Sequence, residues 1–179
     1  MTRRFVLPWL LSIQLVACAP QLTIRGPDPA SVAITVASQD RICVVSPPDG
    51  RSGDTTYEGT GMFVSRRIVQ SLRGHYRNVT LISGGGEKHV AAQCGAVRGR
   101  YLILPTILRW ESHHMLWTGA SERLMVRIEL RPTAGGSVSR VVTYSATRPW
   151  SLRPTEDLLT SQFDVATLSL LSPDSAHAP

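Results

Sequence analysis

Three side chains that can bind a metal stand close together in this sequence: Glu111, His113 and His114. On an extended strand Glu111 and His113 would share a face, so two ligands could converge there. A zinc site needs a third ligand and partners that orient the ligands, and no further residue stands at a spacing that would supply them. We therefore expect a solvent-exposed loop, with no metal and no cofactor. The alternative is a hydrolase or metal-binding protein that uses these three residues.

Two glycine-rich stretches, Gly59-Thr60-Gly61 and Gly84-Gly85-Gly86, precede predicted helices. Backbone N–H groups at such helix starts can hold an anion. Neither stretch has the spacing of a dinucleotide-binding or P-loop motif, and no serine lies in a G-x-S-x-G nucleophile elbow. No set of Ser, His and Asp stands out. We expect turns or close packing at both stretches, and we predict that the protein is not an enzyme.

The N-terminus carries the most specific pattern. Arg3 and Arg4 precede an apolar run at residues 5–16 that is too short to span a bilayer as a helix, and the run leads to Leu15-Val16-Ala17-Cys18. This pattern resembles a bacterial lipobox, in which the cysteine thiol takes a diacylglycerol. The resemblance implies lipidation of Cys18 and a stable anchor of several acyl chains. The alternative is an ordinary signal peptide that contains a cysteine.

The resemblance also implies a location. Ala19 follows Cys18, where an aspartate would resemble an inner-membrane retention signal. We therefore expect a protein attached to the outer membrane and facing the periplasm. In that oxidising compartment Cys43 and Cys94 could form a disulfide. They could equally be buried free thiols, because two cysteines give no spacing pattern that decides between the alternatives.

The elements that must position these residues follow from the hydrophobic pattern. Residues 101–111 are the longest apolar run outside the N-terminus and read as a buried strand, bulged or broken at Pro105. Residues 124–131 alternate between apolar and charged side chains and return through residues 138–145 as a C-terminal antiparallel hairpin. Apolar spacing predicts helices at residues 56–73, 87–93 and from Thr155 onward.

The order of these elements predicts the fold class. We expect a single three-layer α/β domain with a mixed sheet of about five strands and flanking helices. Its predicted organisation is a signal peptide at 1–17, a flexible tether at 18–31, the domain at 32–172 and a disordered tail at 173–179. Within the domain, residues 32–36 could add a short edge strand.

The net charge of +6 comes from 19 basic and 13 acidic residues. The basic residues are spread along the chain without a dense run, so no nucleic-acid partner is expected. A scattered solvated surface is the favoured interpretation.

Two motifs carry a family resemblance: Tyr57-Glu58-Gly59-Thr60-Gly61, and Pro105 followed by Ile107 and the pair Trp110-Glu111. Together they resemble a family of small proteobacterial lipoproteins that is defined only as a domain of unknown function. The sequence departs from the family pattern at Thr60, where serine is usual, and at Ser112-His113-His114. The fold of such proteins is similar to that of the curli secretion channel lipoprotein, the lipoprotein activator of a penicillin-binding protein and the N-terminal domain of the Tol-system propeller protein.

The resemblance implies a non-catalytic binding or assembly module, with envelope proteins as partners. We expect the aromatic-rich segment around Trp110, Met115 and Trp117 to be the partner-binding surface, with core packing of Trp110 as the alternative. The functional alternatives are an envelope hydrolase or metal-binding protein using Glu111 and the two histidines, and an oligomeric secretion-accessory subunit. The sequence specifies neither the partner nor the oligomeric state.

Overall fold

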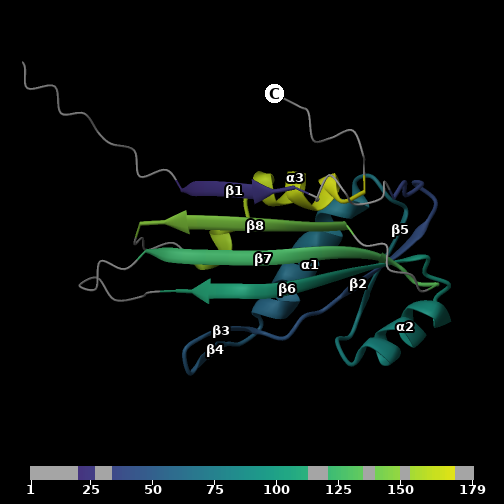
Figure 1. Ribbon diagram of the computed structural model, residues 1–179, viewed down its shortest axis with the longest axis horizontal. Helices are drawn as coiled ribbons and strands as arrows, with labels where there is room; N and C mark the ends of the chain where they lie inside the picture. The colour runs from purple at the N-terminus through teal and green to yellow at the C-terminus, as the bar shows by residue number, and fades with distance from the viewer. Residues whose placement is uncertain (1–19, 27–33, 113–120, 135–139, 150–153, 172–179) are drawn as a thin grey trace, which may run out of the picture.

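A six-stranded mixed sheet forms the centre of the molecule, with strand order β1-β8-β7-β6-β2-β5 (Figure 1). The computed structural model describes residues 20–26, 34–112, 121–134, 140–149 and 154–171. The strands of the large sheet are β1 (Gln21–Arg25), β2 (Arg41–Val45), β5 (Asn78–Ile82), β6 (Tyr101–Glu111), β7 (Glu122–Pro132) and β8 (Arg140–Arg148). The remaining elements are the two-stranded sheet of β3 (Gly50–Ser52) and β4 (Thr55–Tyr57), the helices α1 (Thr60–Arg73), α2 (Glu87–Ala96) and α3 (Ser161–Ser169), and the 3-10 helix η1 (Thr155–Leu158).

The parallel part of the sheet consists of β5, β2 and β6, with β2 in the middle. Helix α1 connects β2 to β5, and its Val64 and Ile68 pack into the larger core cluster together with Val44 of β2. Helix α2 connects β5 to β6, and its Val90 belongs to a separate cluster with Val45. Because alternate residues of β2 face opposite sides of the sheet, the two helices cover opposite faces. This arrangement gives the predicted three layers.

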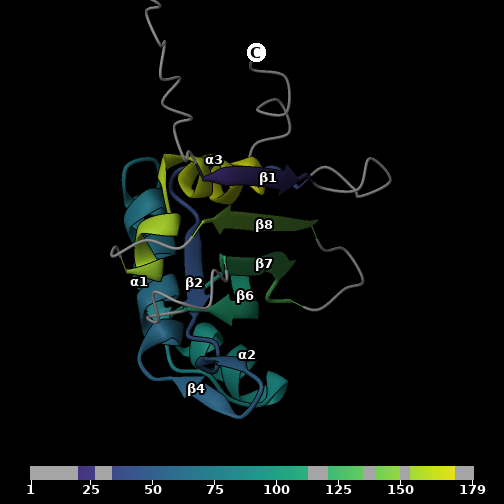
Figure 2. The same cartoon turned by 90° about the vertical axis from the view of Figure 1, so that its left-hand side faces the viewer.

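The antiparallel part is a meander of β6, β7 and β8, with β1 added at the edge. Buried and less buried residues alternate along β7, and Leu124, Val126, Ile128 and Leu130 point to the core, as the sequence predicted. Phe163 of α3 packs edge to face on Tyr144 of β8, with ring centroids 5.2 Å apart. In Figure 2 the strands are seen with α1 to one side of them and α3 beside β1.

Strand β6 runs unbroken and in regular register through Pro105, which corrects the expected bulge or break there. Pairing with β2 ends at Ile103, so β6 has one neighbouring strand at Pro105, where a missing N–H group is tolerated. The irregularity in register lies between Ile107 and Arg109 instead. Leu108, in this bulge, is half exposed.

Three further expectations need correction. Residues 21–25, which were predicted to belong to the tether, form β1 and pair with β8, so the sheet has six strands. Residues 34–36 are not in a strand, although Ile34 and Val36 are buried. The C-terminal helix is divided into η1 and α3, because Leu159 and Thr160 leave the helical conformation and the Thr160 side chain caps α3 by accepting a hydrogen bond from the Gln162 N–H group.

Candidate binding surfaces

A groove of 700 Å³ opens where β2 and β5 end, and we call it the strand-end groove. The residues that line it end β2, follow β2 and β5, come from the first turn of α1, or lie in the middle of β6: Val45, Ser46, Pro47, Pro48, Met62, Ser83, Gly84, Gly85, Leu104, Pro105 and Thr106. Crossovers on opposite faces of a sheet leave a crevice at the carboxyl ends of the strands, which is where α/β proteins commonly bind ligands. The described lining is apolar with three hydroxyl groups and has no ionisable side chain, so this groove is suited to binding rather than to acid–base chemistry.

One glycine of each motif, Gly61 and Gly84, packs closely against the segment that follows β2. A Cβ atom on Gly61 would overlap the carbonyl oxygen of Pro47, and a Cβ atom on Gly84 would overlap that of Ser46. The start of α1 already has an anionic partner, because the Asp49 carboxylate accepts hydrogen bonds from the N–H groups of Gly59 (3.0 Å) and Gly61 (2.8 Å). The packing role expected from the sequence is therefore what the structure has at Gly61 and Gly84.

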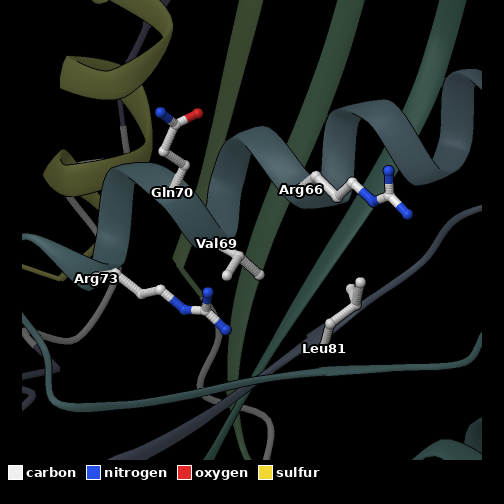
Figure 3. Close-up of a pocket in the computed structure, with 5 residues that line it drawn as sticks. All are labelled: Arg66, Val69, Gln70, Arg73 and Leu81. Atoms are coloured by element: carbon white, nitrogen blue, oxygen red, sulfur yellow. The ribbon is translucent and has the colours of Figure 1, made fainter.

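A second pocket, of 390 Å³, lies between α1 and the edge strand β5, and we call it the arginine pocket (Figure 3). It is lined by Arg66, Val69, Gln70 and Arg73 of α1 and by Leu81 of β5. The two guanidinium groups lie on either side of Val69 and Leu81. None of the ion pairs found among the described residues includes Arg66 or Arg73.

The sequence did not predict this pocket, because the arginines are spread along the whole chain and were interpreted together as a solvated surface. The available signal was the i, i+3, i+4, i+7 spacing of residues 66, 69, 70 and 73, which places them on one side of a helix. Arg67 lies on another side and binds Asp164 of α3, with Nη2 2.6 Å from Oδ2. The arginines of α1 therefore divide into one that holds the fold together and two that face outward.

The proposed partner-binding role of Trp110 is wrong, because its side chain is 1% exposed. It packs within the larger core cluster against the backbone of β3, where a Cβ atom on Gly50 would lie 2.6 Å from Trp110 Cβ. Met115 and Trp117, the other two residues of that hypothesis, lie outside the described residues.

Glu111 is engaged by neighbouring arginines. Its Oε1 lies 3.3 Å from Arg109 Nε, and its Oε2 lies 3.9 Å from Arg123 Nε. His113 and His114 lie outside the described residues, so the convergence of these three side chains stays a hypothesis. Within the part of the chain that the structure describes, no group of three or more His, Cys, Asp and Glu side chains is arranged to hold a metal ion.

Cys43 of β2 and Cys94 of α2 form a disulfide, which decides between the two alternatives that the sequence left open. Both cysteines are fully buried and join α2 to the centre of the sheet. Cys18, the proposed lipidation site, lies outside the described residues. No helix in the described ranges is long and apolar enough to cross a membrane.

Two buried arginines lie at opposite ends of β8. Arg148 donates to Glu122 of β7 through Nε (2.9 Å) and Nη2, and Nη2 also donates to the Pro154 carbonyl (3.1 Å). Arg140 is 7% exposed, and its Nε and Nη1 atoms make no hydrogen bond to the described residues. Burial lowers the pKa of Arg140 from its ordinary value.

Comparisons with known proteins identify the fold. No protein-family model matches the chain, and no match was found among curated proteins. Among solved structures, the chain is similar to a PelC variant from Paraburkholderia phytofirmans, a dodecamer, with a TM-score of 0.64 and 18% identity over 85% of this chain and 99% of that chain. A second PelC dodecamer from the same organism gives a TM-score of 0.59 and 17% identity, over 84% of this chain and 98% of that chain.

A third solved structure is more distant. Protein XCC0632 from Xanthomonas campestris, described with a domain of unknown function, DUF330, gives a TM-score of 0.44 and 14% identity over 80% of this chain and 85% of that chain. The two PelC structures share 18% and 17% of their residues with this chain, and a likeness at this level of identity establishes a shared fold.

Proposed function

We propose that this protein is a lipid-anchored assembly module of the bacterial envelope that works as an oligomer of identical subunits, and that it is not an enzyme. The observation that carries the proposal is the extent of the fold match. The match covers 99% of one PelC subunit, and that PelC variant is a dodecamer. A fold shared over nearly the whole subunit offers this chain the same elements for building subunit contacts. It does not by itself carry the function across.

The proposed location rests on the N-terminus and is compatible with the disulfide. Cys18 would carry the lipid and hold the protein at the outer membrane, facing the periplasm. The Cys43–Cys94 bond is the kind of cross-link that persists in an oxidising compartment. β1 begins at Gln21, three residues after Cys18, and three residues span at most about 10 Å. A lipid on Cys18 would therefore hold the β1 edge of the sheet against the bilayer.

A binding role without catalysis is supported by the chemistry of the two pockets. The described lining of the strand-end groove offers hydroxyl groups without an acid or base beside them. The arginine pocket offers two permanently charged guanidinium groups, which bind anions but are poor proton donors. Glu111, the described member of the hydrolase hypothesis, already lies near two arginines.

Mass measurement of the full chain, extracted from membranes in a mild detergent, tests the proposal. We expect native mass spectrometry and light scattering to give one discrete mass that is a multiple of the subunit mass. Closed assemblies of identical subunits produce such a mass, whereas open-ended assemblies produce a distribution. A monomer at every concentration above the micromolar range would refute the oligomer. A broad mass distribution would refute its closure.

A further inference from the structure

We propose that the arginine pocket and the adjoining edge of β5 form a docking site for an acidic, extended peptide segment of a partner protein. The segment would add to the sheet as a strand beside β5, and its carboxylates would bind Arg66 and Arg73. This inference rests on the proposed role as a binding and assembly module and gives that role a surface and a class of partner.

The first observation is the position of β5 at the end of the sheet. β2 pairs with β5 along the whole strand, from Arg41 opposite Asn78 to Val45 opposite Ile82. On its other side, β5 has no neighbouring strand among the described residues. Alternate backbone N–H and C=O groups of β5 therefore point away from the sheet, and such a row is a template for a strand from another chain.

The second observation is the charge beside that edge. Arg66 and Arg73 are separated by seven residues of α1, which is about 10 Å along the helix axis. Both are exposed, and both line the pocket to which Leu81 of β5 also belongs (Figure 3). Because Arg67 uses Asp164 within the chain and Arg66 and Arg73 have no such carboxylate among the described residues, the free positive charge of α1 lies over the β5 edge.

The third observation is the apolar surface between the two charges. Val69 is 6% exposed, and Leu81 is half-buried against the larger core cluster. In an added strand every second side chain would face α1, and residues i and i+4 would be about 13 Å apart. Acidic residues at i and i+4 would then come within reach of the two flexible arginine side chains, with the residue at i+2 over Leu81. The pattern that fits is acid, any residue, apolar, any residue, acid.

Together these observations favour a peptide over other polyanions. A phosphate group or an acidic polysaccharide could bind the guanidinium groups, but it could not form strand pairing with the β5 backbone. Only an extended peptide can contact the two guanidinium groups and the apolar surface of Val69 and Leu81 while it also pairs with the β5 backbone.

The test uses the full chain in mild detergent and a fluorescent peptide of sequence TETVTET with blocked ends. We expect saturable binding, together with slower hydrogen exchange at the backbone amides of β5. Replacing both glutamates of the peptide by glutamine, or introducing Arg66→Gln with Arg73→Gln, should weaken binding at least tenfold, because each removes two charge-assisted contacts. Arg51→Gln with Arg98→Gln, which changes two exposed arginines elsewhere, is the matched control and should leave binding unchanged.

Four outcomes would overturn the inference. A peptide methylated at every backbone nitrogen has no N–H group to donate to a strand edge, so equal binding of that peptide would exclude strand addition. Binding of heparin without protection of β5 amides, when the peptide does not bind, would make the surface a general polyanion site. Aggregation of the Arg66→Gln, Arg73→Gln variant with no effect on peptide binding would mean that the arginines only guard a free edge.

The fourth outcome is a changed oligomer mass in that variant, which would make the surface a contact between copies of this chain. That result would refute the inference and leave the proposed oligomer standing. Conversely, peptide binding by a chain that is monomeric would support the inference and refute the oligomer.

Discussion

Gly99 shows how one residue permits the link between α2 and the sheet. A Cβ atom at this position would overlap the sulfur atoms of both Cys43 and Cys94. Glycine is therefore the residue that lets the backbone pass over the disulfide. The sequence alone could not pair the two cysteines, because the close approach of residues 43, 94 and 99 is produced by the parallel pairing of β2 with β6.

Reduction of the Cys43–Cys94 bond should lower the free energy of unfolding. The bond closes a loop with a sequence separation of 51 residues. Removing such a cross-link increases the conformational entropy of the unfolded chain and lowers its free energy by about 4 kcal/mol. Urea denaturation with and without dithiothreitol measures the difference. The Cys43→Ser, Cys94→Ser double variant is the control and should be insensitive to the reductant. Equal stability of the oxidised and reduced wild-type protein would contradict the prediction.

Tyr144 should make stability depend on alkaline pH. Burial raises the pKa of Tyr144 above its ordinary value of 10.0, and hydrogen bonding to Thr160 lowers it by less. The folded protein then keeps the phenol proton at pH values where the unfolded chain loses it. The contribution of Tyr144 is complete below about pH 10 and is lost as the pH rises through the higher pKa of the folded state.

Tyr144→Phe isolates this effect from the other tyrosines. The Tyr144 hydroxyl donates to the Leu158 carbonyl at 2.5 Å, so the variant should lose about 1 kcal/mol at pH 8. Between pH 10 and 11.5 its stability should fall less steeply than that of the wild type. Parallel pH dependences of the two proteins in urea denaturation would show that Tyr144 does not titrate differently in the folded state.

At the level of elements, the sequence predicted those whose pattern matches a local rule. Residues 101–111 were predicted as a strand and are β6, and the strict alternation before Pro132 predicted β7. Helix α1 ends at Arg73, the last residue of the helix that apolar spacing predicted at 56–73. Such segments carry enough periodic apolar residues to decide their own conformation.

The elements that the sequence missed depend on partners far away in the chain. β1 shows only Leu22 and Ile24 as apolar alternation, and it becomes a strand because it pairs with residues 143–147 of β8. β3 and β4 are three residues each, too short to show an alternating apolar pattern. The sequence could not decide between a surface and a core position for Trp110, because nothing local in it shows that β3 and α1 lie beside the end of β6. The candidate binding surfaces were missed for the same reason, since each joins several elements.

A buried ion pair ties the ends of β7 and β8 to the segment before η1. Glu122 is 1% exposed and accepts from Arg148, which also donates to the Pro154 carbonyl. Glu122→Ala leaves the buried guanidinium without its carboxylate and should cost about 3–5 kcal/mol. Glu122→Leu with Arg148→Met removes both charges and should cost less than the single variant. Chemical denaturation of the three proteins tests this order, and a double variant less stable than Glu122→Ala would contradict it.

On the scale of the whole molecule, the ends of the sheet have different surroundings. β1 is one edge strand, and the chain before it leads back to Cys18 within three residues. β5 is the other edge strand and lies beside Arg66 and Arg73. Four strands separate the two edges. If Cys18 carries a lipid, the β1 edge faces the bilayer and the arginine pocket lies at the far end of the sheet, accessible to proteins of the periplasm.

Cys18→Ser tests the premise of that arrangement. Without the thiol no diacylglycerol can be attached, so the variant should either remain unprocessed or leave the membrane fraction, whereas wild type should partition with outer membranes.

A fluorophore placed at Thr23 of β1 in the lipidated protein should be quenched by brominated lipids more strongly than one placed at Thr80 of β5, because the distance along the chain from Cys18 to β1 is so short. Equal quenching at the two positions would contradict the proposed orientation even if Cys18 is lipidated. A Cys18→Ser variant that matures and fractionates like wild type would refute the lipid anchor itself, and with it the reason for placing β1 at the membrane.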